Sequence, residues 1–509
     1  MFLHLTVDRR LQIVRTLMLA ALFALPGVLC LHIVSAADSD FWWHLASGQW
    51  IVAHHAVPRT DPFSAYGAGK FWAAYSWLFE VVLFKLYQRW NLAGATVYTA
   101  GMMTFVTAAL YRMIRRQLAD FVLAVLLTLA AIDALLPFRT PRPWLITILV
   151  FILEIDILMH ARRTGGRRGL FLLPPLFALW ANTHIEFAAG LLVLGLAAIE
   201  PLAERWWPQK HTRLRSAVLW PVFAACVAAT LANSYGWRIY QVAYQLVAMP
   251  GAANYVAEMN AIAFRSQSEF VLLFLAFFCV AAVSWTRRIA FFEVAVLALA
   301  IASAFHSARE LWMLTVIAAA ILASVLPANE PGLHKPSVLA IPSIALASCA
   351  ILWLAAASMH VNNAQLRRDL AAQMPVDAVA AIKDGHYRGP LFNTFDWGGF
   401  LIWNLRMPVA IDGRASIYGD RRLARDSATW TAHADWNSDP YLAAAGIVIA
   451  PPDVPLVQVL RFDSRFQLVY EDKIATVFVR KTSQKLPDRP EQPPCAEALK
   501  ASVGASSRK

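Results

Sequence analysis

Long apolar runs separated by short polar segments fill the first 357 residues of the chain. A helix needs about 20 apolar residues, within a range near 17–25, to cross the hydrocarbon core of a bilayer. About eleven runs reach that length, so the pattern predicts a mainly α-helical, polytopic membrane module over residues 1–357. The predicted spanning helices cover residues 12–36, 92–111, 119–136, 144–161, 169–185, 187–203, 216–233, 269–285, 289–305, 311–328 and 336–357.

One further apolar segment, residues 72–90, carries Glu80, Lys85 and Arg89 among many aromatic side chains. Cytoplasmic loops of membrane proteins are enriched in Lys and Arg. If this segment lies in the membrane interface and does not cross, nearly all basic clusters between the other runs face the cytoplasm. The pattern therefore predicts a cytoplasmic N-terminus, a first external loop over residues 38–91 that includes an interfacial helix, and an extracytoplasmic C-terminal part.

The pattern changes between residues 358 and 481, where the apolar runs shorten to strand length and alternate with polar helical patterns. This alternation predicts a small extracytoplasmic α/β domain with its own core. The strand-like runs lie at residues 390–393, 400–403, 408–411, 446–450 and 474–479. The polar, proline-rich tail over residues 482–509 is predicted to be disordered.

Strand ends of open α/β sheets are common ligand sites. Asp396, Asp412 and Arg414 follow predicted strands and are therefore candidate substrate contacts. The neighbouring glycines also fit a simpler interpretation, in which these residues only form turns.

Composition supports the membrane prediction and excludes other classes. The chain is 59% hydrophobic and 15% charged, whereas soluble domains carry about 25% charged residues. The net charge of +12 does not indicate nucleic-acid binding, because the basic residues cluster in short loops between apolar runs. Membrane lipids are the expected partners of this charge, and no nucleic acid is expected. The five cysteines show no paired spacing, so neither a disulfide framework nor a zinc site is predicted.

Polar and charged side chains gather where the predicted helices meet the external face. Ionisable groups at a bilayer boundary cost free energy unless they are solvated or paired, so they are functional candidates. Each group also has a structural interpretation, such as a polar stop signal, an interfacial aromatic anchor or a local ion pair. Their shared location favours one common site. In chain order they are Asp38, Asp40, Trp42, Trp43, His44, Asp61, Arg139, Arg142, His184, Glu186, Asn233, Tyr235, His306 and Arg309.

The chain contains several distinctive motifs, namely DFWWHL from Asp40, PRTDPFS from Pro58, Arg142-Pro, WANTH up to His184, NSYGW from Asn233, WGGFLIW from Trp397 and IDGR up to Arg414. Together they resemble those of a largely uncharacterised bacterial family of membrane glycosyltransferases. The order of elements is similar to that of the C-type (GT-C fold) membrane glycosyltransferases, which use polyprenyl-phosphate-linked sugars. The resemblance implies a GT-C-like helical module in the bacterial inner membrane, with a periplasmic C-terminal domain.

In that superfamily an acidic residue at the start of the first external loop acts as a base or orients a metal ion. The resemblance assigns this role to Asp40 or Asp38, and the Asp-Ser-Asp spacing leaves open which of them is the base. Their hard oxygen ligands would suit Mg²⁺ or Mn²⁺, which are the candidate cofactors.

The leaving lipid phosphate needs fixed cations, and arginine offers it paired donors. Arg139 and Arg142 are the first candidates for this phosphate site, followed by Arg309 and His306. The other polar residues of the external face are expected to bind the sugar or the acceptor.

The sequence thus favours transfer of a sugar from a polyprenyl-phosphate donor to an envelope glycan, lipid or protein on the extracytoplasmic side. A transporter or flippase for a lipid-linked glycan is one alternative, because Asp133, Glu154, Asp156 and Glu293 lie within apolar runs. A non-catalytic protein of polysaccharide assembly is another. The enzyme hypothesis requires that the early aspartates and the arginines share one pocket.

Overall fold

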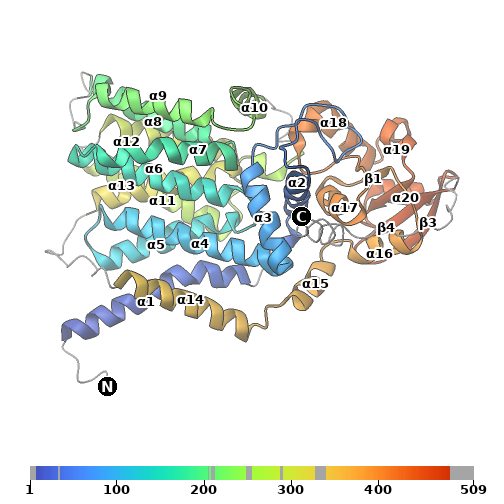
Figure 1. Cartoon of the computed structure of the whole chain (residues 1–509), viewed down its shortest axis with the longest axis horizontal. Coiled ribbons are helices and arrows are strands. Elements are labelled where there is room, and N and C mark those ends of the chain that lie inside the picture. Colours follow the sequence, from blue (N-terminus) through green and yellow to red (C-terminus); the bar gives the residue numbers. More distant parts are fainter. Residues whose placement is uncertain are drawn as a thin grey trace, which may run out of the picture.

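The apolar runs of the first part of the chain form helices that lie side by side in one bundle (Figure 1). The computed structural model describes residues 7–31, 35–203, 206–207, 212–247, 255–286, 290–326 and 340–481, so the predicted disordered tail lies outside the described residues. The bundle helices are α1 (Val7–Leu31), α4 (Leu92–Arg115), α5 (Phe121–Leu135), α6 (Trp144–Thr164), α7 (Leu173–Thr183), α8 (Phe187–Ala203), α9 (Ser216–Thr230), α11 (Gln267–Thr286), α12 (Phe291–His306), α13 (Leu311–Val325) and α14 (Ala340–Ser358).

Within the described residues, seven helical segments are long and apolar enough to cross a membrane, which indicates a membrane protein. They correspond to α1, α4, α5, α6, α11, α13 and α14. The prediction of about eleven spans is not confirmed. Helices α8, α9 and α12 are apolar but shorter, and α7 has 11 residues. The sequence pattern counted apolar residues that the fold places in turns, such as those of the 3-10 turn η4 (Arg168–Leu172) ahead of α7.

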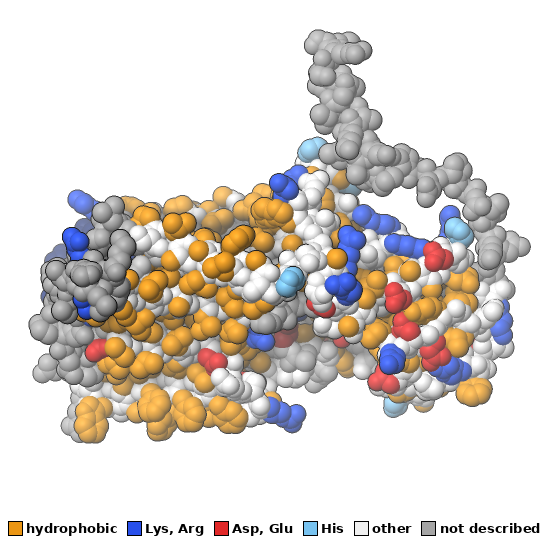
Figure 2. Space-filling model, turned by 90° about the horizontal axis from the view of Figure 1, so that it is seen from below, with side chains coloured by type: hydrophobic (Ala, Val, Ile, Leu, Met, Phe, Trp, Pro, Cys, Tyr) orange, Lys and Arg blue, Asp and Glu red, His pale blue; other side chains and the backbone are white. Residues whose placement is uncertain are grey.

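Apolar side chains also cover the outside of the bundle, whereas the surface of the C-terminal unit carries many charged side chains of both signs (Figure 2). Phe274 and Phe277 of α11 and Trp353 of α14 are 57%, 64% and 69% exposed. Soluble monomers rarely expose large contiguous apolar patches. The surface therefore agrees with a bundle that contacts lipid.

Residues 38–91, the predicted external loop, contain two helices at the junction between the bundle and the C-terminal unit (Figure 1). They are α2 (Phe41–His54) and α3 (Trp77–Trp90). The predicted interfacial helix over 72–90 begins only at Trp77, because Phe71 pairs with Thr60 and the chain turns at residues 75–76 before the helix starts. Helix α3 is not among the candidate spans, and it packs against α2, α4 and α7.

The C-terminal unit contains a four-stranded sheet in the order β1-β2-β4-β3. Strand β1 (Leu391–Asn393) pairs parallel with β2 (Ile447–Ala450), and the pairs of β4 (Thr476–Arg480) with β2 and with β3 (Phe466–Glu471) are antiparallel. Phe392, Val448 and Phe478 belong to its buried core. The helices of this unit are α15 (Asn363–Ala371), α16 (Val376–Asp384), α17 (Gly398–Leu405), α18 (Ala415–Trp430), α19 (Pro440–Ala444) and α20 (Pro455–Leu460).

Two of the predicted strands are wrong. The run 400–403 lies in helix α17, since a short apolar run can form a buried helix as readily as a buried strand. The run 408–411 is irregular and makes only an isolated bridge between Val409 and Ser64. Strand β3 was not predicted; only Phe466 of its six residues is buried, so it lacks the apolar, buried character of the other strands.

The 38–91 segment and the C-terminal unit are docked through their backbones. The Ala65 N–H donates to the Val409 carbonyl at 2.9 Å, and the Val409 N–H donates to the Phe63 carbonyl at 3.2 Å. A side chain at Gly399 would lie 2.9 Å from the Ser39 carbonyl oxygen, so this glycine permits α17 to approach the chain just before α2. The contacts place the start of α2 between the bundle and the C-terminal unit.

Candidate functional site

A cavity of about 90 Å³ lies where the bundle, the 38–91 segment and the C-terminal unit meet. Its wall combines the start of α2, residues 72–76, the start of α6, the turn after α7, the 3-10 turns η6 (Ala257–Met259) and η7 (Ala308–Glu310), and the residues before α18. Segments far apart in the sequence thus bring acidic and basic groups together. The charged and titratable lining residues are Asp40, His44, Tyr75, Glu80, Arg142, His184, Glu258, Arg309 and Arg414.

Asp38 and Asp40 are positioned by the beginning of α2. Asp40 is the residue that precedes the helix, and its backbone N–H donates to Oδ1 of Asp38 at 2.9 Å. One turn later, the Trp43 indole N–H donates to Oδ1 of Asp40 at 3.0 Å. Helix N-termini favour negative charge, so this placement suits ionised carboxylates.

Arg142 connects these aspartates to a third acid. Its Nε donates to both carboxylate oxygens of Asp38 at 2.8 and 2.9 Å. Its Nη1 lies 2.8 Å from Oδ2 of Asp40 and 3.0 Å from Oε2 of Glu258. The guanidinium is also 4.6 Å from the centre of the Trp144 ring, which holds it from one side. One arginine side chain is therefore shared by three carboxylates from two distant segments.

Arg309 adds a second positive charge. Its Nη1 lies 4.0 Å from Oε1 of Glu258, beyond hydrogen-bond distance. Arg309 and Arg142 both line the cavity, so Glu258 lies between two guanidinium groups. Asp40 therefore shares one cavity with Arg142 and Arg309, which come from other segments of the chain.

The surroundings move the pKa of Asp40 into the neutral range. Burial raises the pKa of Asp40, the Arg142 guanidinium lowers it in part, and the carboxylates of Asp38 and Glu258 raise it again; the net result is a pKa of about 7. For Glu258 the balance is opposite: burial raises its pKa, but Arg142 and Arg309 outweigh that effect and lower it below the usual value. Asp40 can therefore gain or lose a proton near neutral pH, whereas Glu258 stays ionised.

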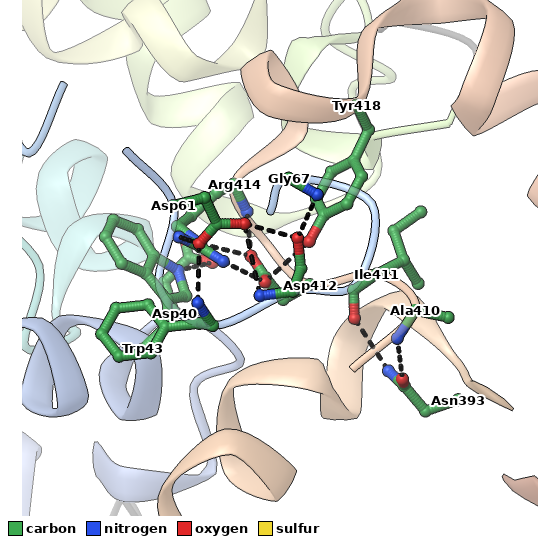
Figure 3. A network of polar contacts seen from close by, with 12 residues as sticks. Asp40, Trp43, Asp61, Gly67, Asn393, Ala410, Ile411, Asp412, Arg414 and Tyr418 are labelled. Carbon is green, nitrogen blue, oxygen red and sulfur yellow. Dashed lines mark hydrogen bonds and ion pairs between the residues drawn. The ribbon is translucent and has the colours of Figure 1, made fainter. Parts of the chain in front are cut away.

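A second polar network joins the 38–91 segment to the C-terminal unit (Figure 3). Arg414 donates from Nη1 to Oδ1 of Asp61 at 2.7 Å, and from Nη2 and Nε to the two oxygens of Asp412 at 2.6 and 2.8 Å. The Tyr418 hydroxyl donates to Asp412 at 2.8 Å, and the Ser64 hydroxyl donates to Asp61. All of these side chains are buried. Their mutual pairing indicates that Asp61, Asp412 and Arg414 hold the two parts together.

The Asp61–Arg414 ion pair lies between the cavity and a second depression. Arg414 lines the first cavity, and Asp61 lines a second, more open depression of about 770 Å³ that also has Arg388 and Arg406 at its wall. Next to Arg414, a side chain on Gly413 would lie 2.0 Å from Oδ1 of Asp40. The C-terminal unit therefore reaches the catalytic candidate directly, and a larger residue at position 413 would displace the Asp40 carboxylate.

His44 belongs to a buried contact between α2 and α3. Its Nδ1 lies 3.1 Å from Oε1 of Glu80, and the Ser47 hydroxyl donates to Oε2 of Glu80 at 2.5 Å. Burial lowers the pKa of His44 and raises the pKa of Glu80 to about 8, so both groups are neutral near pH 7. This neutral hydrogen-bonded pair joins α2 to α3 at the wall of the cavity.

His184 and Glu186 lie near Arg309. His184 lines the cavity and its Nδ1 is 2.8 Å from the Thr147 hydroxyl. Burial raises the pKa of Glu186, and Arg309 partly opposes the shift. Trp43 also lines the cavity, with its ring 3.5 Å from that of His44.

The fold places the remaining candidates outside the cavity. Arg139 donates to the Leu136 carbonyl at 2.6 Å, and His306 is exposed at the end of α12. Trp42 is buried and donates to the Ala36 carbonyl at 2.7 Å. Arg139 and His306 are therefore not positioned for the phosphate-binding role expected from the sequence. Asp396 also lies outside the lining residues, at the surface.

Asn233 and Tyr235 have a structural role. The Asn233 side chain closes its own turn, donating to the Thr230 and Gly236 carbonyls at 2.6 and 3.1 Å. The Tyr235 hydroxyl donates to the Pro58 carbonyl and accepts from the Ala74 N–H, both at 2.7 Å. Tyr235 thereby fixes both ends of the chain stretch that enters the cavity wall.

Sequence reasoning missed Glu258 and Glu80 as parts of the site. Glu258 lies in a long loop without a motif, and only its position on the external side was available as a signal. The pattern of residues 72–90 predicts only an interfacial helix that carries Glu80 as one of its charges. Its spacing from Phe79 and Leu83 on the buried face of α3 was the available signal.

Among the described residues, no group of three or more His, Cys, Asp or Glu side chains is arranged to hold a metal ion. Asp38, Asp40 and Glu258 converge on a guanidinium instead. The carboxylates present do not fit the Mg²⁺ or Mn²⁺ site considered from the sequence.

No protein-family model matches the chain, and a comparison with curated proteins gives no match.

Proposed function

We propose that the protein is a membrane glycosyltransferase that moves a sugar from a polyprenyl-phosphate donor to an envelope glycan, lipid or protein acceptor. The observation that supports this proposal is the convergence of Asp40, Arg142 and Arg309 on one cavity at the end of an apolar helix bundle. A lipid-linked donor would keep its chain in the bilayer and present its phosphate at this level. The proposed setting is a bacterial inner membrane, with a cytoplasmic N-terminus and the cavity and C-terminal unit in the periplasm.

In the proposed reaction, Asp40 acts as the general base. An acceptor hydroxyl is a weak nucleophile, and a carboxylate within hydrogen-bond reach takes its proton as the new bond to the anomeric carbon forms. The pKa of Asp40 near 7 suits this role at neutral pH. Asp38 positions Asp40 and Arg142 through the hydrogen bonds described above. Attack from the face opposite the phosphate inverts the anomeric centre.

The bond that breaks joins the anomeric carbon to the phosphate oxygen, and its electron pair leaves with the phosphate. Guanidinium groups stabilise this developing charge when they are fixed beforehand. Arg309 and Arg142 supply these groups. No step is assigned to a metal ion, because the carboxylates of Asp38, Asp40 and Glu258 all face the Arg142 guanidinium.

Part of the acceptor outside the reacting hydroxyl would rest in the second depression, which is bordered by exposed Arg388 and Arg406. The buried Asp61–Arg414 pair separates this depression from the cavity that contains Asp40. The proposal assigns acceptor recognition to the C-terminal unit and the 38–91 segment.

The test uses the purified protein in detergent micelles with a panel of polyprenyl-phosphate sugars and measures the release of free lipid phosphate. Release that depends on Asp40 supports the proposal. A panel that yields no release above a protein-free control, at any acceptor supplied, counts against it.

One observation favours a second candidate, a transporter of lipid-linked glycans. Both carboxylate oxygens of Glu154 in α6 are buried without a hydrogen-bond partner in the described part of the chain. Ionisable groups inside a helix bundle often mark transport pathways. A Glu154→Gln variant separates the two functions: a glycosyltransferase keeps its rate of phosphate release, whereas a transporter loses movement of a fluorescent lipid-linked sugar across liposomes.

A further inference from the structure

The Glu258 side chain has two cationic neighbours and sits within the cavity wall. Its two carboxylate oxygens face Nη1 of Arg142, at 3.0 and 3.2 Å, and Oε1 also faces Nη1 of Arg309 at 4.0 Å. The Glu258 side chain is 31% exposed and that of Arg309 is 24% exposed. Arginine pairs with carboxylate and with phosphate oxygens in the same way, so the Glu258 carboxylate occupies the position that a bound phosphate oxygen could take.

The two arginines are not equally engaged. Arg142 has three carboxylate partners, whereas no hydrogen bond joins the Arg309 guanidinium to another residue in the described ranges of the chain. The five N–H donors of an arginine fit two oxygens of a phosphate. Arg309 therefore has N–H donors left for an anion in this cavity.

The backbone that carries Glu258 is anchored, so the side chain can move alone. The Ala308 N–H donates to the Asn260 carbonyl at 2.8 Å, which joins η6 to the turn that carries Arg309. Met259 packs against Ile411 and Tyr418 of the C-terminal unit. A rotation of the Glu258 side chain away from the arginines would leave these contacts intact.

The cavity is too small for a sugar phosphate as it stands. Its volume of about 90 Å³ holds a few water molecules, whereas ligand pockets usually measure about 300–1,000 Å³. Some group in the wall must move before a donor can bind. Movement of the Glu258 side chain would enlarge the cavity and also expose the guanidinium groups of Arg142 and Arg309.

We infer that Arg142 and Arg309 form a binding site for one phosphate group, and that Glu258 occupies this site until a phosphate monoester or diester displaces its carboxylate. The inference rests on the proposed function for the identity of the ligand, a polyprenyl phosphate. Glu258 thus reduces the affinity of the empty site and prevents nonproductive binding of other anions.

Direct binding tests this inference without any transfer reaction. The full-length protein in lipid nanodiscs is titrated with a C20 polyprenyl phosphate and, in a separate arm, with inorganic phosphate, and heats of binding give Kd. If Glu258 occupies the site about nine-tenths of the time, Glu258→Gln tightens binding of the lipid phosphate about tenfold. Arg309→Gln weakens it in both backgrounds. If Glu258→Gln tightens binding of the polyprenyl phosphate but not of inorganic phosphate, the ligand is a lipid headgroup. If it tightens binding of both equally, the phosphate group alone is the ligand.

Glu269→Gln is the matched control, because it removes a carboxylate from the first turn of α11, the helix that follows the loop carrying Glu258. The Glu269 carboxylate accepts from the Arg265 and Ser266 backbone N–H groups and does not line the cavity. This variant should bind as the unchanged protein does. Unchanged or weaker binding by Glu258→Gln, in a protein that keeps its thermal stability, overturns the inference.

The two proposals fail separately. Tightened binding by Glu258→Gln with no release of lipid phosphate from any sugar donor keeps the anion site and removes the transfer reaction. Asp40-dependent release with unchanged affinity of Glu258→Gln keeps the enzyme and removes the displacement of Glu258.

Discussion

Nη1 of Arg142 lies 2.8 Å from Oδ2 of Asp40, and the same nitrogen serves Glu258 at 3.0 Å. A single donor group thus faces two acids, one of which has a pKa of about 7 and the other a pKa below its usual value. The charge on Asp40 therefore depends on how Arg142 is held. This coupling links the proposed base to the proposed phosphate site.

Asp40→Asn should remove transfer while the protein still folds. Loss of a general base typically lowers a rate by about 10²–10⁴-fold. Asparagine keeps the shape of the side chain and can still accept from Trp43, so the start of α2 is preserved. Initial rates of lipid-phosphate release, compared at equal amounts of membrane protein, give the measurement. A rate within twofold of the original would exclude Asp40 as the base.

The rate should rise with pH through about 7. A base works only when deprotonated, and kcat/KM reports the pKa of the free enzyme, so the acidic limb should follow Asp40. Arg142 lowers that pKa, and Arg142→Gln should therefore move the limb to higher pH as well as weaken donor binding. A pH series of kcat/KM on both proteins measures the shift. A limb that stays in place, or moves to lower pH, would show that another group titrates.

The helix bundle could be predicted from the sequence because its signal is local. Apolar runs specify helices directly, and the strands at Leu391–Asn393 and Ile447–Ala450 follow from short runs between turns. The run 400–403 could not be assigned in this way. Its helix is stabilised by packing of Gly399 against residues before α2, a contact that the local sequence does not reveal.

The site was predictable only in part, for a related reason. Residues such as Asp40, Arg142 and Arg309 are conspicuous because they are charged at helix ends, and the fold brings them together. The pairing of Asp61 with Arg414 spans 353 positions, so the sequence could suggest function for each but not their mutual neutralisation. Glu258 had no neighbouring motif, and its role depends entirely on the three-dimensional approach of two arginines.

Arg414→Gln should destabilise the protein strongly. The substitution leaves Asp61 and Asp412 buried without their cation, and removing one partner of a buried pair costs about 3–5 kcal/mol. Arg461→Gln is the control in the same unit, because the Arg461–Glu471 pair is exposed and exposed pairs contribute little to stability. Thermal unfolding in detergent should show a large fall in Tm for the first variant and little change for the second. Equal Tm values would mean that Arg414 does not hold the two parts together.

Gly413→Ala should lower the transfer rate without unfolding the protein. The added methyl group would lie 2.0 Å from Oδ1 of Asp40 and 3.1 Å from the Trp43 indole nitrogen, so the carboxylate must move away from its donor. A displaced base affects kcat more than the donor KM, since the arginines are untouched.

Gly101→Ala in α4 is the matched control, because nothing lies within 4 Å of the added atom. In a helix interior this change is neutral or stabilising by up to about 1 kcal/mol. Full activity in both variants would show that Asp40 tolerates displacement and is not the base. Loss of activity in Gly413→Ala alone, at an unchanged Tm, would show that transfer requires the close approach of the C-terminal unit to Asp40.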